Sequence, residues 1–153
     1  MKRILRLSLS FIISYLSLSG AAAQTTATDI INQMSPGWNL GNTLEATHWN
    51  GAALYNNVAG LSAETAWQDT KTTQQIIDFV KSQGFRSVRI PVAWVYGHIS
   101  DAANYTIDKA WMNRVKEVVN YCINDGLYVV INDHWDGGWL EEHIKDTNAG
   151  TIA

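Results

Sequence analysis

The sequence predicts an α/β fold built around a parallel sheet, and two observations support this. First, hydrophobic strand-like segments alternate with segments of helical periodicity. In chain order, the expected strands and helices are residues 37–42, 72–83, 85–92, 107–124 and 127–131. This alternation requires crossover connections and therefore parallel strands. Second, the junction Gln83–Val88 is similar to Asp125–Val130, and this weak internal repeat fits either a βα barrel or an open sheet.

Residues 1–24 are predicted to be a secretory signal peptide. Three basic residues precede a mostly apolar stretch at residues 7–18, and Ala21–Ala23 provide the small residues of a cleavage site. The alternative is a buried N-terminal helix, and the segment is too short and wrongly flanked to span a membrane. We therefore expect a secreted protein, extracellular or periplasmic, with residues 25–153 as its mature part.

Short elements and a long loop open the mature chain. Residues 29–34 are expected to form one helical turn, and Pro36-Gly37 a turn that leads into the strand at residues 37–42. Residues 43–68 are rich in Asn, Gly, Ala and Thr and show no sustained period. We expect a long loop there, and long loops in compact domains usually carry function.

The two expected helices have recognisable ends and apolar faces. Gly84 is the expected C-terminal stop of the helix at residues 72–83, and Asp108 is the expected N-cap of the helix at residues 107–124. Pro91 suggests that the strand between the helices stops or bends near its end. The expected buried faces are Ile76, Ile77, Phe79 and Val80 in the first helix, and Trp111, Val115, Val118, Val119 and Cys122 in the second.

The charge balance is acidic and argues against nucleic acid or an anionic membrane as the main partner. The whole chain has 11 Lys and Arg and 14 Asp and Glu. Removal of the signal peptide leaves eight basic residues and a net charge of −6, which fits a protein acting on a neutral polymer. Cys122 is the only cysteine, so an intrachain disulfide is impossible, and it is expected to be a small core residue.

A polar and aromatic cluster follows the last expected strand. The run Tyr128–Ile131 predicts a strand buried on both faces, and it stops at Asn132, Asp133, His134, Trp135 and Asp136. Binding groups collect at such strand ends in α/β folds. Trp135 and Trp139, beside amide, imidazole and carboxylate groups, suit the apolar faces and hydroxyls of a sugar. The cluster therefore predicts a carbohydrate site.

Arg89 and His134 are the strongest candidates for chemistry. Arg89 lies inside an apolar strand, where a charge needs a partner, either a carboxylate in the site or a structural ion pair. His134 is either a functional residue at a strand end or a hydrogen-bonded structural one. Candidate acids and bases are Glu45, Asp133, Asp136, Glu141 and Glu142.

Motifs for cofactors and metals are missing from the sequence. It contains no Gly-rich phosphate loop, serine elbow or CxxC pair. His134, Asp136 and His143 do not have a familiar ligand spacing. We therefore expect neither a cofactor nor a metal.

Three segments occur in a defined order: GWNLGNTLEA from Gly37, GFRSVRIPVAW from Gly84 and YVVINDHW from Tyr128. Together they resemble the first three strands of glycoside hydrolase family 5, the large cellulase family, and in particular its bacterial endoglucanases. The resemblance covers roughly residues 34–143. It implies that residues 25–153 are a partial catalytic domain: about three βα units from the N-terminal portion of a (β/α)8 TIM barrel, cut off after the third strand.

The resemblance also implies a mechanism and roles for individual residues. The family hydrolyses β-1,4-glycans with retention, using one Glu as acid/base and another as nucleophile. Arg89 matches the arginine that hydrogen-bonds the nucleophile, and His134 matches the histidine that contacts sugar near the cleavage point. Asn42 and Trp135 are implied substrate contacts, although many relatives carry a second histidine at the position of Trp135. Weaker aromatic candidates are Trp49, Trp94 and Trp139.

Neither catalytic Glu has a match in the sequence, since the family places them after the fourth and seventh strands. We therefore expect an N-terminal fragment of an endo-β-1,4-glucanase that is inactive and folds poorly alone, and a monomer in full-length form. Its partner would be β-glucan or a related polysaccharide. One alternative is a non-catalytic secreted carbohydrate-binding protein. Another is a different barrel enzyme, a sugar isomerase or aldolase, although no Lys lies in an expected strand.

Overall fold

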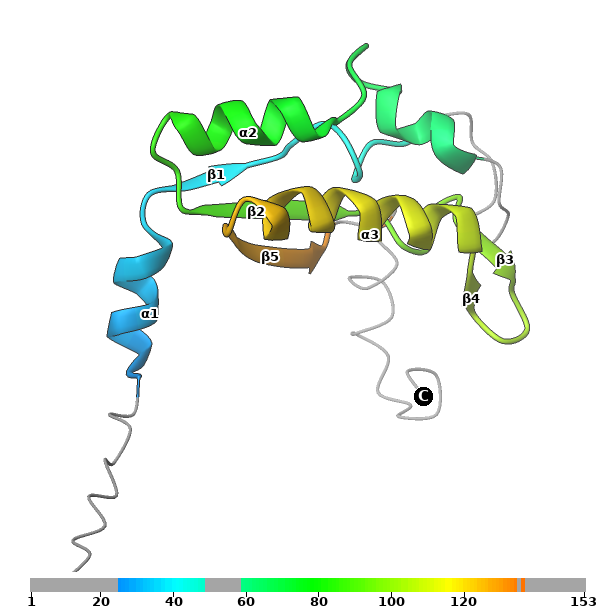
Figure 1. Cartoon of the computed structure of the whole chain (residues 1–153). Coiled ribbons are helices and arrows are strands. Elements are labelled where there is room, and N and C mark those ends of the chain that lie inside the picture. The colour runs from blue at the N-terminus through cyan, green and yellow to red at the C-terminus, as the bar shows by residue number, and fades with distance from the viewer. Residues whose placement is uncertain (1–24, 49–58, 135, 137–153) are drawn as a thin grey trace, which may run out of the picture.

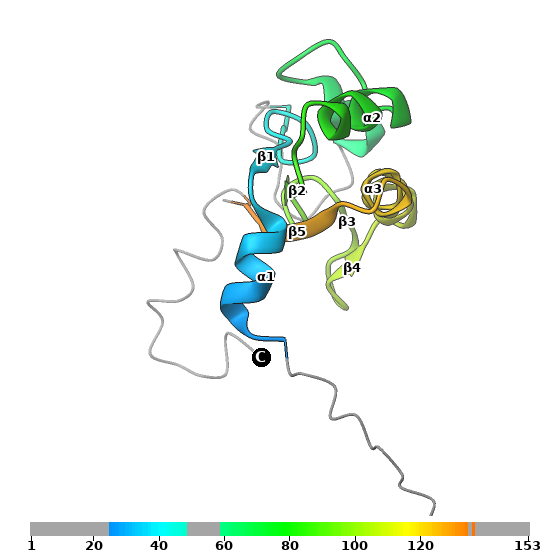
Figure 2. The same cartoon turned by 60° about the vertical axis from the view of Figure 1, so that its left-hand side comes forward.

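A parallel three-stranded sheet with two helices on one face forms the body of the molecule (Figures 1 and 2). The computed structural model describes residues 25–48, 59–134 and 136. The strands β1 (Gly37–Asn39), β2 (Ser87–Val92) and β5 (Tyr128–Asp133) lie in the order β1-β2-β5 and all pair in parallel. The helices α2 (Gln74–Ser82) and α3 (Lys109–Asn124) supply the crossovers. The predicted α/β class is therefore confirmed.

The core lies between the sheet and the two helices. Ile77 and Val80 of α2 are buried, as predicted, whereas Phe79 is 64 % exposed, so its predicted place in the core is wrong. Cys122 is buried as predicted, and burial raises the pKa of its thiol to about 11. The central strand and α3 complete the core with Val88, Ile90, Val92, Trp111, Val115 and Val118.

Strand β5 is much more exposed than the sequence predicts. Val130 and Ile131 are 41 % and 45 % exposed, so burial on both faces is wrong for this strand. The physical reason is its place in the sheet, because β2 has a partner on each side whereas β5 pairs only with β2 among the described residues. Its apolar composition therefore does not match the environment that it has in this structure.

Several short elements appear where the sequence predicts only a turn or a loop. The helix α1 (Ala27–Met34) is longer than the expected single turn, and Thr26 and Asp29 form a capping box at its start. A 3-10 helix, η1 (Gly60–Thr65), lies within the expected long loop. The strands β3 (Ile99–Asp101) and β4 (Thr106–Ile107) form a small antiparallel hairpin before α3.

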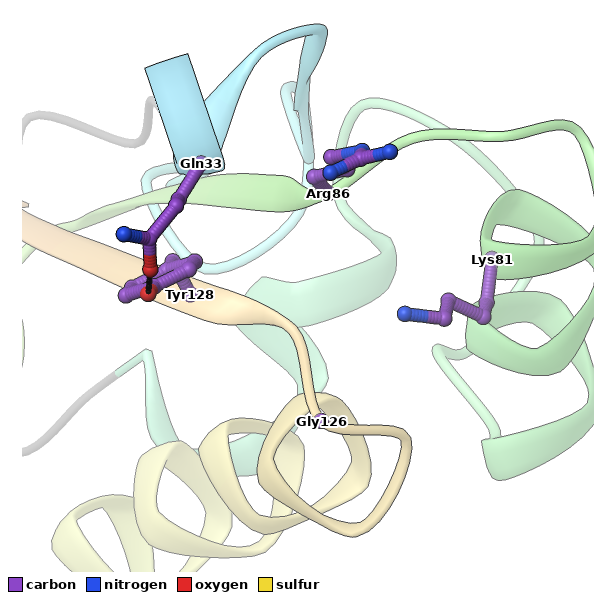
Figure 3. A pocket seen from close by; sticks show the side chains of 5 residues that line it. All are labelled: Gln33, Lys81, Arg86, Gly126 and Tyr128. Carbon is purple, nitrogen blue, oxygen red and sulfur yellow. Dashed lines mark hydrogen bonds between the residues drawn. The ribbon is translucent and has the colours of Figure 1, made fainter. Parts of the chain in front are cut away.

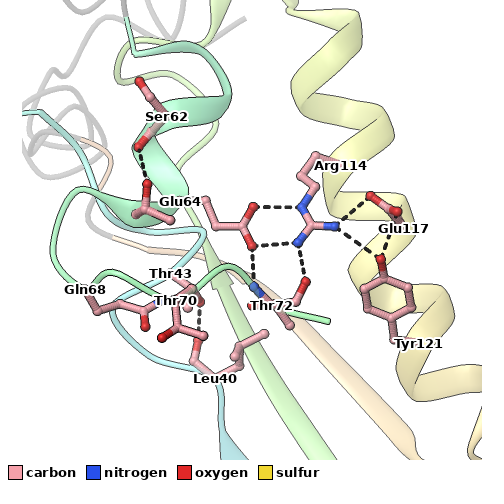
Figure 4. A network of polar contacts seen from close by, with 11 residues as sticks. Leu40, Thr43, Ser62, Glu64, Gln68, Thr70, Thr72, Arg114, Glu117 and Tyr121 are labelled. Carbon is pink, nitrogen blue, oxygen red and sulfur yellow. Dashed lines mark hydrogen bonds and ion pairs between the residues drawn. The ribbon is translucent and has the colours of Figure 1, made fainter. Parts of the chain in front are cut away.

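A buried ion pair joins η1 to α3 (Figure 4). Both carboxylate oxygens of Glu64 accept from the guanidinium of Arg114 at 2.7 Å, and neither side chain is more than 5 % exposed. Arg114 also donates to the backbone carbonyl of Thr72 at 2.6 Å, while the N–H of Thr72 donates to Glu64 at 2.9 Å. The pair thus fixes both η1 and the segment before α2 against the same helix.

None of the helices within residues 25–48, 59–134 and 136 has the length and apolar character that a membrane span requires. The predicted signal peptide, residues 1–24, lies outside the described residues.

The start of α3 provides a test of the predicted N-cap. Asp108 precedes the helix, and its side chain accepts from the backbone N–H of Trp111 at 2.9 Å. We expect Asp108→Ala to lower the free energy of unfolding by about 1 kcal/mol, because that N–H loses its partner, and Asp108→Ser to restore most of the loss. Chemical denaturation of the three proteins measures both effects. An equal loss for Ala and Ser would contradict the capping role.

Candidate functional site

The C-terminal edge of the parallel sheet brings three polar side chains together. Asn39 ends β1, Arg89 lies beside it in register on β2, and His134 directly follows β5. The Arg89 guanidinium donates to Oδ1 of Asn39 at 2.6 Å and lies 3.2 Å from Nδ1 of His134. Because carboxyl ends of parallel strands meet at one edge, residues 95 positions apart in the chain share one site.

This geometry determines which ring nitrogen of a neutral His134 carries the proton. A guanidinium has only donors, so Nδ1 of His134 must accept. The ring proton of a neutral His134 therefore lies on Nε2. The site therefore offers the Nε2–H of His134 as a donor. It also offers the N–H groups of Arg89 that do not contact Asn39 or His134.

The two interpretations of Arg89 both assumed a carboxylate partner. Within the described part of the chain, Arg89 forms no ion pair, and its contacts are an amide oxygen and an imidazole nitrogen. Within the described residues, Arg89 is therefore held by these two contacts and not by a structural ion pair. Asn39 is its nearest partner and was not among the predicted site residues, because the expected strand ran to residue 42 and only the structure places Asn39 at a strand end.

Two carboxylates that the sequence offered as acids or bases instead brace loops. Glu45 is 6 % exposed and accepts from the backbone N–H groups of Asn42 at 2.6 Å and Thr43 at 3.0 Å. Asn42 itself is exposed and has a positive φ of 61°, a conformation that Asn tolerates better than most residues. The contact to Glu45 therefore fixes the backbone that carries this predicted substrate contact.

Asp136 connects the segment after β5 to the segment after β2. Its carboxylate is 2 % exposed and accepts from the backbone N–H groups of Trp94, Val95 and Tyr96 at 2.7–2.9 Å. Burial raises the pKa of Asp136 to about 6, whereas the three N–H donors act to lower it. The carboxylate thereby positions the backbone of the half-buried Trp94 near the site, a role that sequence spacing alone did not reveal.

The remaining candidates are not brought together by the described structure. Trp49, Trp135 and Trp139 lie outside the described residues, as do Glu141, Glu142 and His143. Asp133 is exposed at the end of β5. The part of the chain that the structure describes contains no group of three His, Cys, Asp or Glu that could hold a metal ion.

A cavity of about 230 Å³ borders β1 and the segment that follows it, and the Arg89 cluster does not line it. Figure 4 shows several of its residues next to the Glu64–Arg114 pair. The cavity is lined by Trp38, Leu40, Gly41, Thr43, Gln68, Thr70, Thr72 and Ile76.

Comparisons with known proteins agree on one family. A family model described as cellulase (glycosyl hydrolase family 5) matches residues 47–153. Endoglucanase A of Ruminococcus albus is 41 % identical over 141 residues, which is 90 % of this chain and 36 % of that protein. The chain thus spans about a third of the length of this relative.

Solved structures confirm the fold. A xyloglucan-specific β-1,4-glucanase from a ruminal metagenomic library, XEG5B, is 53 % identical with a TM-score of 0.65, over 82 % of this chain and 31 % of that one. A broad-specificity endoglucanase from Ruminococcus champanellensis with bound cellotriose is 44 % identical with a TM-score of 0.66, over 75 % and 32 %. The predicted βα units therefore match part of a TIM barrel.

Proposed function

The chain belongs to glycoside hydrolase family 5, and on this premise we propose that it is part of a secreted endo-β-1,4-glucanase. The observation that carries the proposal is the cluster of Asn39, Arg89 and His134 at the C-terminal edge of the sheet. Barrel enzymes place their active sites at this edge. The cluster offers only N–H donors to a ligand, which suits a carboxylate nucleophile and sugar hydroxyls.

Each residue of the cluster has a distinct proposed role. Arg89 holds the nucleophile Glu ionised through a charge-assisted hydrogen bond, because a cation beside a carboxylate favours its charged form. Asn39 orients the guanidinium through its 2.6 Å contact. His134 donates its Nε2–H to a substrate hydroxyl near the cleaved bond.

The substrate contacts are proposed to surround this cluster. Asn42 stands on the loop braced by Glu45, and Trp94 on the loop braced by Asp136. Trp49, Trp135 and Trp139 would add aromatic faces against which pyranose rings can stack. The R. champanellensis enzyme binds cellotriose, and XEG5B is xyloglucan-specific, which supports a β-1,4-glucan as the substrate class.

The two catalytic Glu are proposed to lie on barrel strands other than β1, β2 and β5. Hydrolysis with retention then proceeds by two displacements at the anomeric carbon. Nucleophile attack expels the leaving sugar while the acid/base Glu protonates its oxygen. Water then releases the covalent glycosyl intermediate, with the same Glu now acting as base. We further propose that residues 1–24 direct export, and that the complete enzyme is a monomer without a cofactor.

Arg89 provides the test of this proposal. The first step is to read the coding DNA past codon 153 and express the complete protein. We expect Arg89→Lys to lower kcat/KM on a soluble β-glucan about 100-fold, because lysine cannot bond both the nucleophile and Asn39 in fork geometry. Lys116→Arg on the exposed face of α3 is the matched control and should leave activity unchanged.

The outcomes separate the proposal from its alternative. We expect the 153-residue chain alone to release no reducing sugar, and the complete protein to do so. A complete protein that binds cellotriose but never hydrolyses it would favour a non-catalytic carbohydrate-binding protein. Unchanged activity in Arg89→Lys would show that Arg89 does not support the nucleophile.

A further inference from the structure

A second cavity lies at the opposite end of the sheet from the Arg89 cluster (Figure 3). It has a volume of about 220 Å³ and collects residues from the ends of five segments. These are the end of α1, the last turn of α2, the residue before β2, the turn after α3 and the start of β5. The lining residues are Gln33, Lys81, Arg86, Gly126 and Tyr128.

The side chains around this cavity offer hydrogen-bond donors and almost no acceptors. The Tyr128 hydroxyl donates to Oε1 of Gln33, so the Gln33 amide nitrogen is left as a donor. Lys81 and Arg86 contribute an ammonium and a guanidinium, and neither forms an ion pair within the described residues. Among the residues that the structure describes, no carboxylate lines the cavity. A ligand that satisfies this lining must be rich in acceptors and negatively charged.

The positions of these donors are set by the sheet. The Arg86 backbone N–H donates to the carbonyl of Pro36 at 2.9 Å, and its carbonyl accepts from Tyr128 at 2.9 Å. Gly126 has a φ of +66°, and a Cβ there would meet no atom within 4 Å, so this wall of the cavity stays open. Asp125 interacts electrostatically with Lys81 and with Asp78, and neither carboxylate is among the residues that line the cavity.

We propose that this cavity binds a small oxyanion through Arg86, Lys81 and the Gln33 amide. A guanidinium matches two oxygens of phosphate or of a carboxylate in parallel, and an ammonium adds a point charge. Two sources fit this chemistry: free phosphate, and the carboxylate of an acidic sugar. The site is separate from the Arg89 cluster, so the proposal does not depend on the proposed function.

The test is a titration of the complete protein at constant ionic strength, followed by NMR or calorimetry. The probes are inorganic phosphate and, in a second arm, glucuronate. We expect saturable binding of at least one probe with a Kd of about 1 mM, which corresponds to about −4 kcal/mol. Arg86→Gln and Lys81→Gln should each weaken binding about tenfold. Lys116→Gln, which removes one exposed cation elsewhere, is the matched control.

Each outcome decides the proposal. Binding of phosphate alone identifies a free anion as the ligand, and binding of glucuronate alone identifies an acidic sugar. Competition between both probes identifies the shared oxyanion chemistry. Equal weakening of binding in all three variants would show only a general charge effect. A binding signal that does not saturate would also show only a general charge effect. Either result overturns the proposal. Circular dichroism of the variants, whose side chains are exposed, checks that the fold is retained.

Discussion

Replacing Glu64 by Gln is expected to lower the free energy of unfolding by about 3 kcal/mol. The substitution leaves the Arg114 guanidinium buried without the carboxylate that both Nε and Nη2 contact at 2.7 Å. A guanidinium does not lose its proton in proteins, so Arg114 cannot avoid this cost by becoming neutral. Chemical denaturation at neutral pH measures the loss.

Glu117 provides the matched control for this prediction. It contacts the same guanidinium at 2.6 Å, but its side chain is 53 % exposed (Figure 4). Glu117→Gln makes the same chemical change in a solvated place and should cost less than about 1 kcal/mol, because water screens the pair and replaces it. Equal losses in the two variants would show that burial of the Glu64 pair does not govern its contribution.

His98 is expected to make the fold sensitive to acid. Its side chain is fully buried and stacks on Trp111, with ring centroids 3.7 Å apart and planes 6° from parallel. Neither ring nitrogen has a hydrogen-bond partner among the described residues, so a charged imidazolium would have no compensation from them. Burial lowers the pKa of His98 to about 4, and the nearby Asp108 opposes this only in part.

The sign of the effect follows from these pKa values. The unfolded chain, with a His pKa near 6.5, binds more protons than the folded chain between pH 4 and 6.5. The contribution of His98 to stability is therefore complete above pH 6.5 and is lost as the pH falls to 4. The difference amounts to about 3 kcal/mol.

His98→Phe isolates this contribution, because it keeps an aromatic ring against Trp111 and removes the titration. Between pH 7 and pH 4, we expect the unmodified protein to lose about 3 kcal/mol more than the variant in chemical denaturation. Asp136, whose raised pKa acts in the opposite direction over the same range, titrates in both proteins and cancels in the difference. Parallel stability curves for the two proteins would contradict the prediction.

The sequence by itself determined the elements whose signals are local. Helices α2 and α3, the positive-φ stop Gly84 and the cap Asp108 all depend on contacts within about four residues. Such contacts leave a periodic or positional pattern in the chain. The order of strands and helices then required parallel strands, whose carboxyl ends share one edge of the sheet.

Only the tertiary structure decided which distant groups become partners. Glu64 and Arg114 are 50 residues apart, and the contacts from Asp136 to the loop after β2 span 40 to 42 residues. The exposure of β5 likewise depends on whether a neighbouring strand covers it, which its own apolar residues do not encode. A carboxylate looks the same in a sequence whether it performs chemistry, braces a loop or neutralises a buried cation. The tertiary environment of the carboxylate, which only folding creates, determines which of these roles it has.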